Sequence, residues 1–223
     1  MFSRLLMICF VLLIGISPIT AKGALTIDDF EDGTYTEDPK WWVFGKLGLL
    51  TEFNNPKEGS FLGRQSLRLY GKSKDWYVGG FGTYLSVDSR KYMGLKIVVK
   101  GTGVDSGTLK IELYDDDNGT FKIEKHPLYP SKAMSDDKFV YNLAVDWKGW
   151  KVMTIPFTSF LDDNPGIGDD KWNPYQRKES GGLIQIQIVA LSTGQKGVVN
   201  TAIDSIKLVK PKPKKKMKKR RYY

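Results

Sequence analysis

The chain has 223 residues, of which 41% are hydrophobic and 13% aromatic, so it can form a packed core and is not disordered as a whole. Its formal net charge of +9 suggests a nucleic-acid-binding protein, but nine of the 34 basic residues lie in the last fourteen positions. The other 25 basic residues are matched by 25 acidic ones. The body of the chain is therefore neutral, and we expect no nucleic-acid partner.

The N-terminus has the pattern of a secretory signal peptide. A basic start precedes an apolar run at 5–16, and small residues follow it. The run is too short for a comfortable membrane span. We predict that 1–23 is a signal peptide that directs the protein to the periplasm or outside the cell, with cleavage after Ala21 or Gly23; a retained N-terminal anchor is the alternative. The only cysteine, Cys9, lies in this segment, so the mature chain forms no disulfide.

From residue 24 onward, short β-strand patterns alternate with turns. The strand patterns are rich in β-branched and aromatic residues, and Gly, Asn and Asp separate them. No segment has the periodicity of an amphipathic helix, and no internal repeat is present. In chain order the predicted strands are 24–30, 41–44, 47–53, 66–70, 76–87, 95–100, 108–114, 121–124, 138–145, 150–155, 182–191 and 202–209.

Three segments give more detailed predictions. Several glycines interrupt 76–87, as expected where a strand bends or takes a bulge. A short strand before Lys148 is predicted to turn at Lys148-Gly149 into a second strand, which should end at Pro156 or lie on a sheet edge, because proline has no N–H to donate. The Asn-Gly pair at 118–119 predicts a hairpin between the strands on either side of it.

These strands, with turn signals about every 8–12 residues, predict an all-β fold, a β-sandwich of the jelly-roll type. No linker rich in Pro, Gly or Ser divides them, so we expect one domain at 24–209. The basic segment 210–223 is predicted to be a disordered tail. It is interpreted either as a contact to an anionic surface or as a solubilising terminus.

Three motifs resemble the galactose-binding-like carbohydrate-binding modules, most closely family 11, and the related domain of the complex I intermediate-associated proteins. They are 27–31 (Ile-Asp-Asp-Phe-Glu), 150–160 and 203–208, in an order and spacing that fit. The resemblance implies a concave sheet that binds a glucan chain and a structural calcium near the chain ends. In the segment 182–191, where glucan-binding members have aromatic residues, this sequence offers Ile186, Ile188 and Val189.

Sugar binding needs flat aromatic surfaces for the apolar face of a pyranose ring and polar groups beside them for hydroxyls. Aromatic residues near the glycine-rich strand and in the acidic loops meet this need, although each of them is alternatively a core or loop-anchoring residue. The predicted ligand-binding residues are Trp76, Tyr77, Tyr84, Tyr114, Asp115, Asp163, Trp172 and Tyr175. The tryptophans assigned to the core are Trp41, Trp42, Trp147 and Trp150.

For calcium, Glu31 and Asp204 are the predicted side-chain ligands and Asp29 is a third candidate, on terminal strands that a jelly roll brings together. The alternative is a solvated acidic strand end. The acidic run 115–119 lacks the ligand spacing of an EF-hand and is interpreted as a hairpin turn.

Catalysis is not indicated by any motif: the sole histidine, His126, has no cysteine to join it, and nothing fixes the spacing of a carboxylate pair. Our first hypothesis is a monomeric, non-catalytic carbohydrate-binding module that holds a β-glucan-type polysaccharide on a concave aromatic face. The second is an envelope scaffold or assembly factor that uses the same sandwich to bind a protein. The third is a jelly-roll glycosidase or lyase that acts on glucan or cellulose.

Overall fold

The computed structural model describes residues 23–54, 63–125, 127–128, 134–177, 180–193 and 197–211. The predicted signal peptide up to residue 22, the predicted tail from residue 212 and His126 lie outside these residues. The described part contains twelve β-strands and three short 3₁₀ helices, η2 (Ser89–Lys91), η3 (Val104–Ser106) and η4 (Phe157–Ser159). Within it, no apolar helix reaches the length that a bilayer crossing requires.

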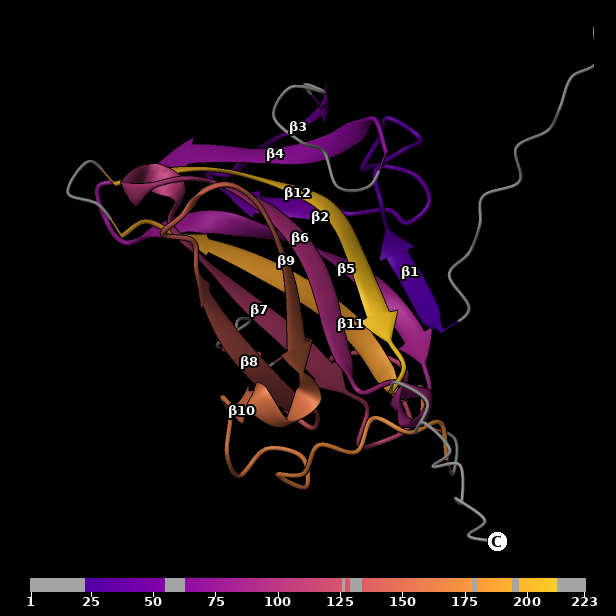
Figure 1. The fold of residues 1–223 in the computed structure, drawn as a ribbon. Helices are drawn as coiled ribbons and strands as arrows, with labels where there is room; N and C mark the ends of the chain where they lie inside the picture. The colour runs from indigo at the N-terminus through magenta and orange to yellow at the C-terminus, as the bar shows by residue number, and fades with distance from the viewer. Residues whose placement is uncertain are drawn as a thin grey trace, which may run out of the picture.

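The strands form two antiparallel sheets that pack face to face (Figure 1). We name each sheet after its central strand. The β12 sheet has the order β3 (Gly48–Phe53), β4 (Gln65–Lys72), β12 (Val198–Val209), β6 (Gly94–Thr102) and β9 (Lys148–Pro156), with β1 (Ala24–Asp28) also paired to β12. The β11 sheet has the order β10 (Leu161–Asp162), β8 (Asp137–Ala144), β7 (Thr108–Asp115), β11 (Leu183–Leu191), β5 (Tyr77–Val87) and β2 (Trp42–Gly45). The predicted all-β jelly-roll sandwich is confirmed.

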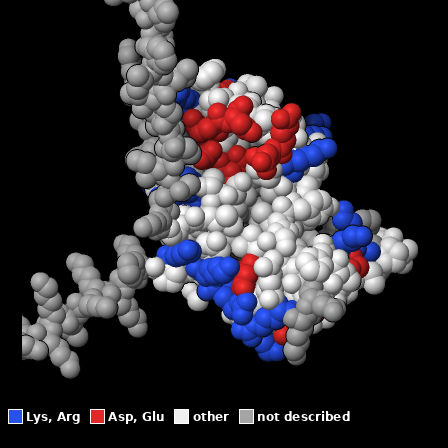
Figure 2. All heavy atoms as spheres, turned by 90° about the vertical axis from the view of Figure 1, so that its right-hand side faces the viewer, with Lys and Arg blue, Asp and Glu red and all other residues white. Residues whose placement is uncertain are grey.

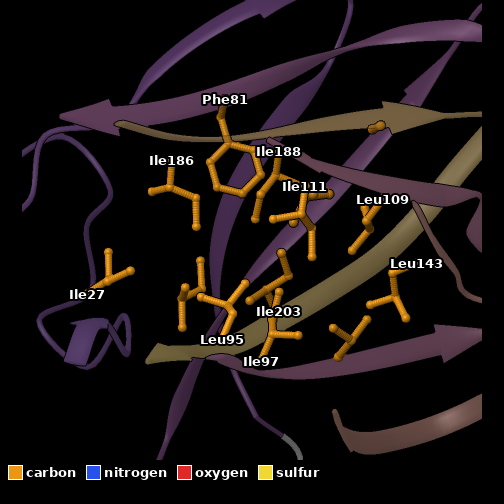
Figure 3. Close-up of a cluster of buried hydrophobic side chains, with 14 of the residues drawn as sticks. Ile27, Phe81, Leu95, Ile97, Leu109, Ile111, Leu143, Ile186, Ile188 and Ile203 are labelled. Atoms are coloured by element: carbon orange, nitrogen blue, oxygen red, sulfur yellow. The ribbon is translucent and has the colours of Figure 1, made fainter. Parts of the chain in front are cut away.

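The core lies between the sheets and follows from the two-residue period of each strand. Leu95 and Ile97 of β6 point toward Ile111 of β7 and Ile188 of β11, and all four side chains are fully buried (Figure 3). Phe81 of β5 fills the same layer. Because alternate residues of β7 and β11 point inward, the residues between them face the opposite side of the β11 sheet. That outward side is free to carry a binding surface.

The predictions for individual segments had different outcomes. The strand after Lys148 does end at Pro156, and β9 is also an edge strand of its sheet. However, β9 is one continuous strand from Lys148, so the predicted turn at Lys148-Gly149 is wrong. The bulge in the glycine-rich strand is confirmed, because the β5–β11 register shifts next to Gly79. The hairpin at 118–119 is wrong, because β7 pairs with β8 and the segment 121–124 contains no strand.

Asp28, at the end of β1, connects that strand to the core. Its carboxylate is buried and accepts hydrogen bonds from the Phe30 backbone N–H and the Trp41 indole N–H, both at 2.7 Å. The Trp41 ring in turn lies 5.0 Å from that of Phe81, centroid to centroid, so its assignment to the core is confirmed. Burial raises the pKa of Asp28 to about 6.

We expect Asp28→Ala to lower the free energy of unfolding by about 2 kcal/mol, because two buried donors lose their acceptor. Urea denaturation at neutral pH measures the loss. Asp29→Ala is the matched control, since the Asp29 carboxylate is partly exposed and its ion pair with Lys207 is long, at 3.9 Å. The control should change the stability by less than about 0.5 kcal/mol. Equal effects of the two substitutions would contradict this role for Asp28.

Candidate functional site

The outward face of the β11 sheet is hollowed into a groove of about 1140 Å³. Strands β2, β5, β7, β8 and β11 form its floor and walls, and the segment 121–125 borders it. Its aromatic lining residues are Trp42, Phe44, Trp76, Tyr77, Tyr84, Tyr114 and Phe121. Its polar and charged lining residues are Lys110, Glu112, Lys122, Lys125, Lys138, Gln185 and Gln187, and its aliphatic ones are Ile123, Val189 and Leu191.

Strand β11 shows how the sequence builds this face. Ile186 and Ile188 are fully buried in the core, whereas Gln185, Gln187 and Val189 line the groove. Ile186 and Ile188, which stand where the resemblance places aromatic residues, therefore lie on the core side of the strand and not in the groove. The face that lines the groove presents two amides, which are suitable hydrogen-bonding groups for hydroxyls.

Two glycines of β5 make room for aromatic rings on the groove floor. Across the β2–β5 pairing, Trp42 stands opposite Gly82 and Phe44 opposite Gly80. A Cβ atom on Gly82 would lie 2.5 Å from Cζ2 of Trp42, and one on Gly80 would lie 2.5 Å from Cζ of Phe44. The rings thus lie flat against backbone that only glycine leaves uncovered. Trp42 is half-buried and contacts Tyr84, with ring centroids 4.6 Å apart, so its assignment to the core is wrong.

Two aromatic side chains stand well into solvent, one just before β5 and one within it. Trp76 is 66% exposed and Tyr84 is 69% exposed. Tyr77 lies beside Trp76 with an edge-to-face ring contact of 6.1 Å between centroids. Tyr84 lies seven positions after Tyr77 in the chain, and at the rise of an extended strand this spacing places the two aromatic groups about 20 Å apart. The groove is therefore long enough to face several units of an extended polymer.

Glu112 of β7 is the centre of a polar network on the groove floor. Its carboxylate accepts hydrogen bonds from Nε2 of Gln187 at 2.7 Å and from the hydroxyl of Tyr114 at 3.1 Å. It also pairs with Nζ of Lys110 at 3.2 Å. Burial, followed by the charge of Glu112, raises the pKa of Tyr114, so its hydroxyl stays protonated and donates. Gln185 makes no side-chain hydrogen bond to any described residue and is available to a ligand.

Asp163 joins two groove lysines at the edge of the network. One of its carboxylate oxygens lies 2.9 Å from Nζ of Lys110 and 2.7 Å from Nζ of Lys138. Burial alone would lower the pKa of Lys110, but its bonds to Asp163 and the charge of Glu112 raise it. Burial would raise the pKa of Asp163, yet the two lysines hold it below its usual value. Lys110 and Asp163 therefore both carry charge at neutral pH.

The groove collects half of the predicted ligand-binding residues: Trp76, Tyr77, Tyr84 and Tyr114 line it. Asp163 borders it through its lysine partners. The lining residues that sequence reasoning missed include Trp42, Phe44, Lys110, Glu112, Gln185 and Gln187. Strict alternation within β7 and β11 is the signal that would have found the last four.

Three predicted ligand residues lie elsewhere. The Trp172 ring packs on Phe157, 4.7 Å away, and on Phe139, 5.2 Å away, and so anchors its loop to the core. The guanidinium of Arg177 lies over the Tyr175 ring at 4.9 Å from its centroid. Asp115 is buried at the end of β7 and belongs to an acidic cluster.

This cluster, here called the acidic end, comprises Asp115, Asp117, Asp136, Asp137 and Asp169. Among the described residues, oxygens of Asp117, Asp137 and Asp169 form the one group of three within 4.8 Å of one another, a donor set that can hold a divalent cation. The carboxylates also organise the loop after β10. Asp137 accepts from the backbone N–H of Lys171 at 3.1 Å, and Asp115 accepts from that of Asn173 at 2.9 Å.

Burial and repulsion between neighbouring carboxylates raise pKa values in the acidic end. Burial, followed by the charge of Asp117, raises the pKa of Asp115 to about 8. Burial raises the pKa of Asp117 to about 7, with further contributions from Asp137 and Asp169. Burial and Glu124 raise that of Asp136 to about 7.

The predicted calcium ligands do not belong to the acidic end. Asp204 is fully buried on β12 and accepts from Nδ2 of Asn54 at 3.2 Å, whereas Glu31 accepts from the backbone N–H of Arg64 at 2.8 Å. Figure 2 shows acidic side chains gathered on the upper part of the face that carries β1. Nevertheless, the carboxylate oxygens of Asp29, Glu31 and Asp204 do not all lie within 4.8 Å of one another. These side chains do not by themselves fit a calcium ion, and the predicted site remains a prediction.

Comparison with models of known protein families finds no match, and comparison with curated proteins finds none. Solved structures do match. The family 11 carbohydrate-binding module of the cellulosomal cellulase Lic26A-Cel5E of Clostridium thermocellum has a TM-score of 0.53 and 16% identity, covering 86% of this chain and 97% of that one. A Clostridium thermocellum family 11 module in complex with a β-1,3-1,4-mixed-linked tetrasaccharide has a TM-score of 0.52 and 17% identity, covering 86% and 98%. At these identities the similarity establishes a shared fold.

Proposed function

We propose that this protein is an exported, non-catalytic module that binds a β-glucan-type polysaccharide along the groove. The observation that carries the proposal is the groove itself, which is long, open and lined by exposed aromatic rings beside amide and carboxylate groups. The shared fold supports it, since one of the compared structures holds a mixed-linked β-glucan tetrasaccharide.

The chemistry of the groove suits a sugar chain. A pyranose ring presents C–H groups on its faces, which stack on aromatic rings, and hydroxyls at its edge. Trp76 and Tyr84 offer exposed rings near the two ends of the groove. Between them, Gln185, Gln187 and Glu112 offer donors and acceptors from neighbouring strands. The rigid sheet holds these groups in place before the ligand arrives, which reduces the entropy cost of binding.

Isothermal titration with β-1,4-, β-1,3- and mixed-linked glucan oligosaccharides tests the proposal, with an α-linked glucan as the negative control. We expect saturable binding to at least one β-glucan and no release of reducing ends on prolonged incubation. Absence of binding across the β-glucans would contradict the proposed function, and release of reducing sugar would contradict its non-catalytic character.

Gly82→Ala is expected to weaken binding about tenfold, because the new methyl group must push the Trp42 ring off the groove floor. The change is read by titration and by the intrinsic tryptophan fluorescence of the free protein. Leu50→Ala on β3, an exposed position of the other sheet, is the control and should leave both readings unchanged. Normal affinity of the Gly82 variant would show that Trp42 is not part of the binding surface.

A further inference from the structure

We propose that the groove selects a chain whose sugars carry carboxylates, a uronic-acid polysaccharide, over its neutral counterpart; the inference rests on the proposed function and specifies its substrate class. The first observation is the charge of the lining. Four lysines line the groove against one glutamate. A neutral glucan needs no such excess of cations.

Two of these lysines are already neutralised within the protein. Lys110 pairs with Glu112 and Asp163, and Lys138 pairs with Asp163. Two positive charges and two negative charges therefore cancel on the groove floor. Lys122 and Lys125 remain, both exposed on the border segment 121–125, and neither has an ion-pair partner among the described residues. The excess positive charge of the groove is thus concentrated at one edge, within reach of a ligand.

The fold holds this edge in a defined shape. The buried carboxylate of Asp116 accepts hydrogen bonds from the backbone N–H groups of Gly119 at 3.0 Å, Phe121 at 3.3 Å and Gly181 at 2.6 Å. Phe121 has a backbone φ of +59°, which is unfavourable for a bulky residue and persists only where its surroundings enforce it. Its ring is 52% exposed and lines the groove next to Lys122.

The exposed ring of Phe121 and the ammonium group of Lys122 match two features of a uronic acid. The ring can stack on the pyranose face, and the ammonium group can pair with the carboxylate at its edge. The acidic residue nearest in the chain, Glu124, forms no ion pair with Lys122 or Lys125 among the described residues. Its carboxylate is engaged by Nδ2 of Asn118 at 2.8 Å and by the Thr120 hydroxyl, and it is not part of the lining. Charge-assisted hydrogen bonds are stronger than neutral ones, so a carboxylate gains more than a hydroxymethyl group at this edge.

The test uses two oligosaccharides of equal length that differ in one group: a β-1,4-linked glucose oligomer and its C6-oxidised counterpart, a β-1,4-linked glucuronic acid oligomer. Titration of the full chain at low salt should give about tenfold tighter binding of the oxidised oligomer. The advantage should shrink as sodium chloride is raised to about 0.5 M, because salt screens exposed charges. Replacing both Lys122→Gln and Lys125→Gln should remove the advantage, so that the variant binds the oxidised and the neutral oligomer with equal affinity.

Two controls separate the groove from other positive charge. The pair Lys72→Gln and Lys148→Gln removes exposed lysines from the β12 sheet, and a triple substitution of lysines 214–216 by glutamine removes charge from the basic C-terminus. Both controls should keep the advantage. Equal affinity of the two oligomers for the unmodified chain would overturn this inference and leave the proposed function standing. Failure of both oligomers and of all neutral β-glucans to bind would overturn both. Loss of the advantage only in the C-terminal variant would also overturn it.

Discussion

Replacing Trp76 and Tyr84 together by alanine is expected to weaken glucan binding at least about 100-fold, or about 2.8 kcal/mol. Each ring is more than half exposed in the free protein and becomes covered when a sugar stacks on it, so each truncation removes burial that exists only in the complex. Because the rings contribute little to the core, the thermal midpoint of unfolding should change by no more than about 2 °C.

Titration with the best-bound β-glucan, together with a thermal melt, measures both quantities. The matched control is Phe53→Ala, which removes an aromatic ring that is 80% exposed on β3 of the β12 sheet. It should bind as the unmodified chain does. If the double variant kept its affinity while Phe53→Ala lost it, the binding surface would lie on the β12 sheet and the proposed site would be wrong.

The stability of the protein in a chelating buffer is expected to fall as the pH rises from about 5 to about 8.5. Asp115, Asp117 and Asp136 have pKa values of about 8, 7 and 7, well above those of unfolded aspartates. Between these values and the unfolded ones the folded state binds more protons, so the free energy of unfolding decreases with pH. We expect a loss on the order of 3 kcal/mol, seen as a midpoint lower by roughly 10 °C.

Differential scanning calorimetry across this pH range measures the trend, and the chelator keeps divalent cations from masking it. Asp117→Asn removes one of the repelling charges, so its stability should fall less steeply. Asp75→Asn, at an exposed position outside the acidic end, should reproduce the slope of the unmodified chain. Stability that rises between about pH 5 and about pH 8.5 would show that the carboxylates ionise without difficulty in the folded state.

The elements that could be predicted from the sequence are those whose signal is local. Period-two alternation located the strands, and the missing N–H of Pro156 correctly ended β9. The hairpin at 118–119 failed because the turn is held in another way: the Asp116 carboxylate accepts the N–H of Gly119, and β7 takes β8 as its partner.

The same difference between local and long-range signals decides which residues of the candidate site could be predicted. Trp76 and Tyr84 could be found because they flank a conspicuous run of glycines in their own strand. Trp42 could not, because its place on the groove floor depends on Gly82, forty residues away and opposite it only after the sheet has formed. Trp172 was predicted to bind a ligand because its own loop gives no sign that the ring is covered. The ring of Phe157 that covers it comes from a different segment.

The sheet that carries the groove ends in very short strands. Its two outermost members, β10 and β2, are two and four residues long. So little unpaired backbone gives another chain almost no template to add a strand. Molecules bound side by side on one polymer would accordingly not associate by pairing the edge strands of this sheet. Even at high density on the polymer, each molecule would stay separate and could exchange independently.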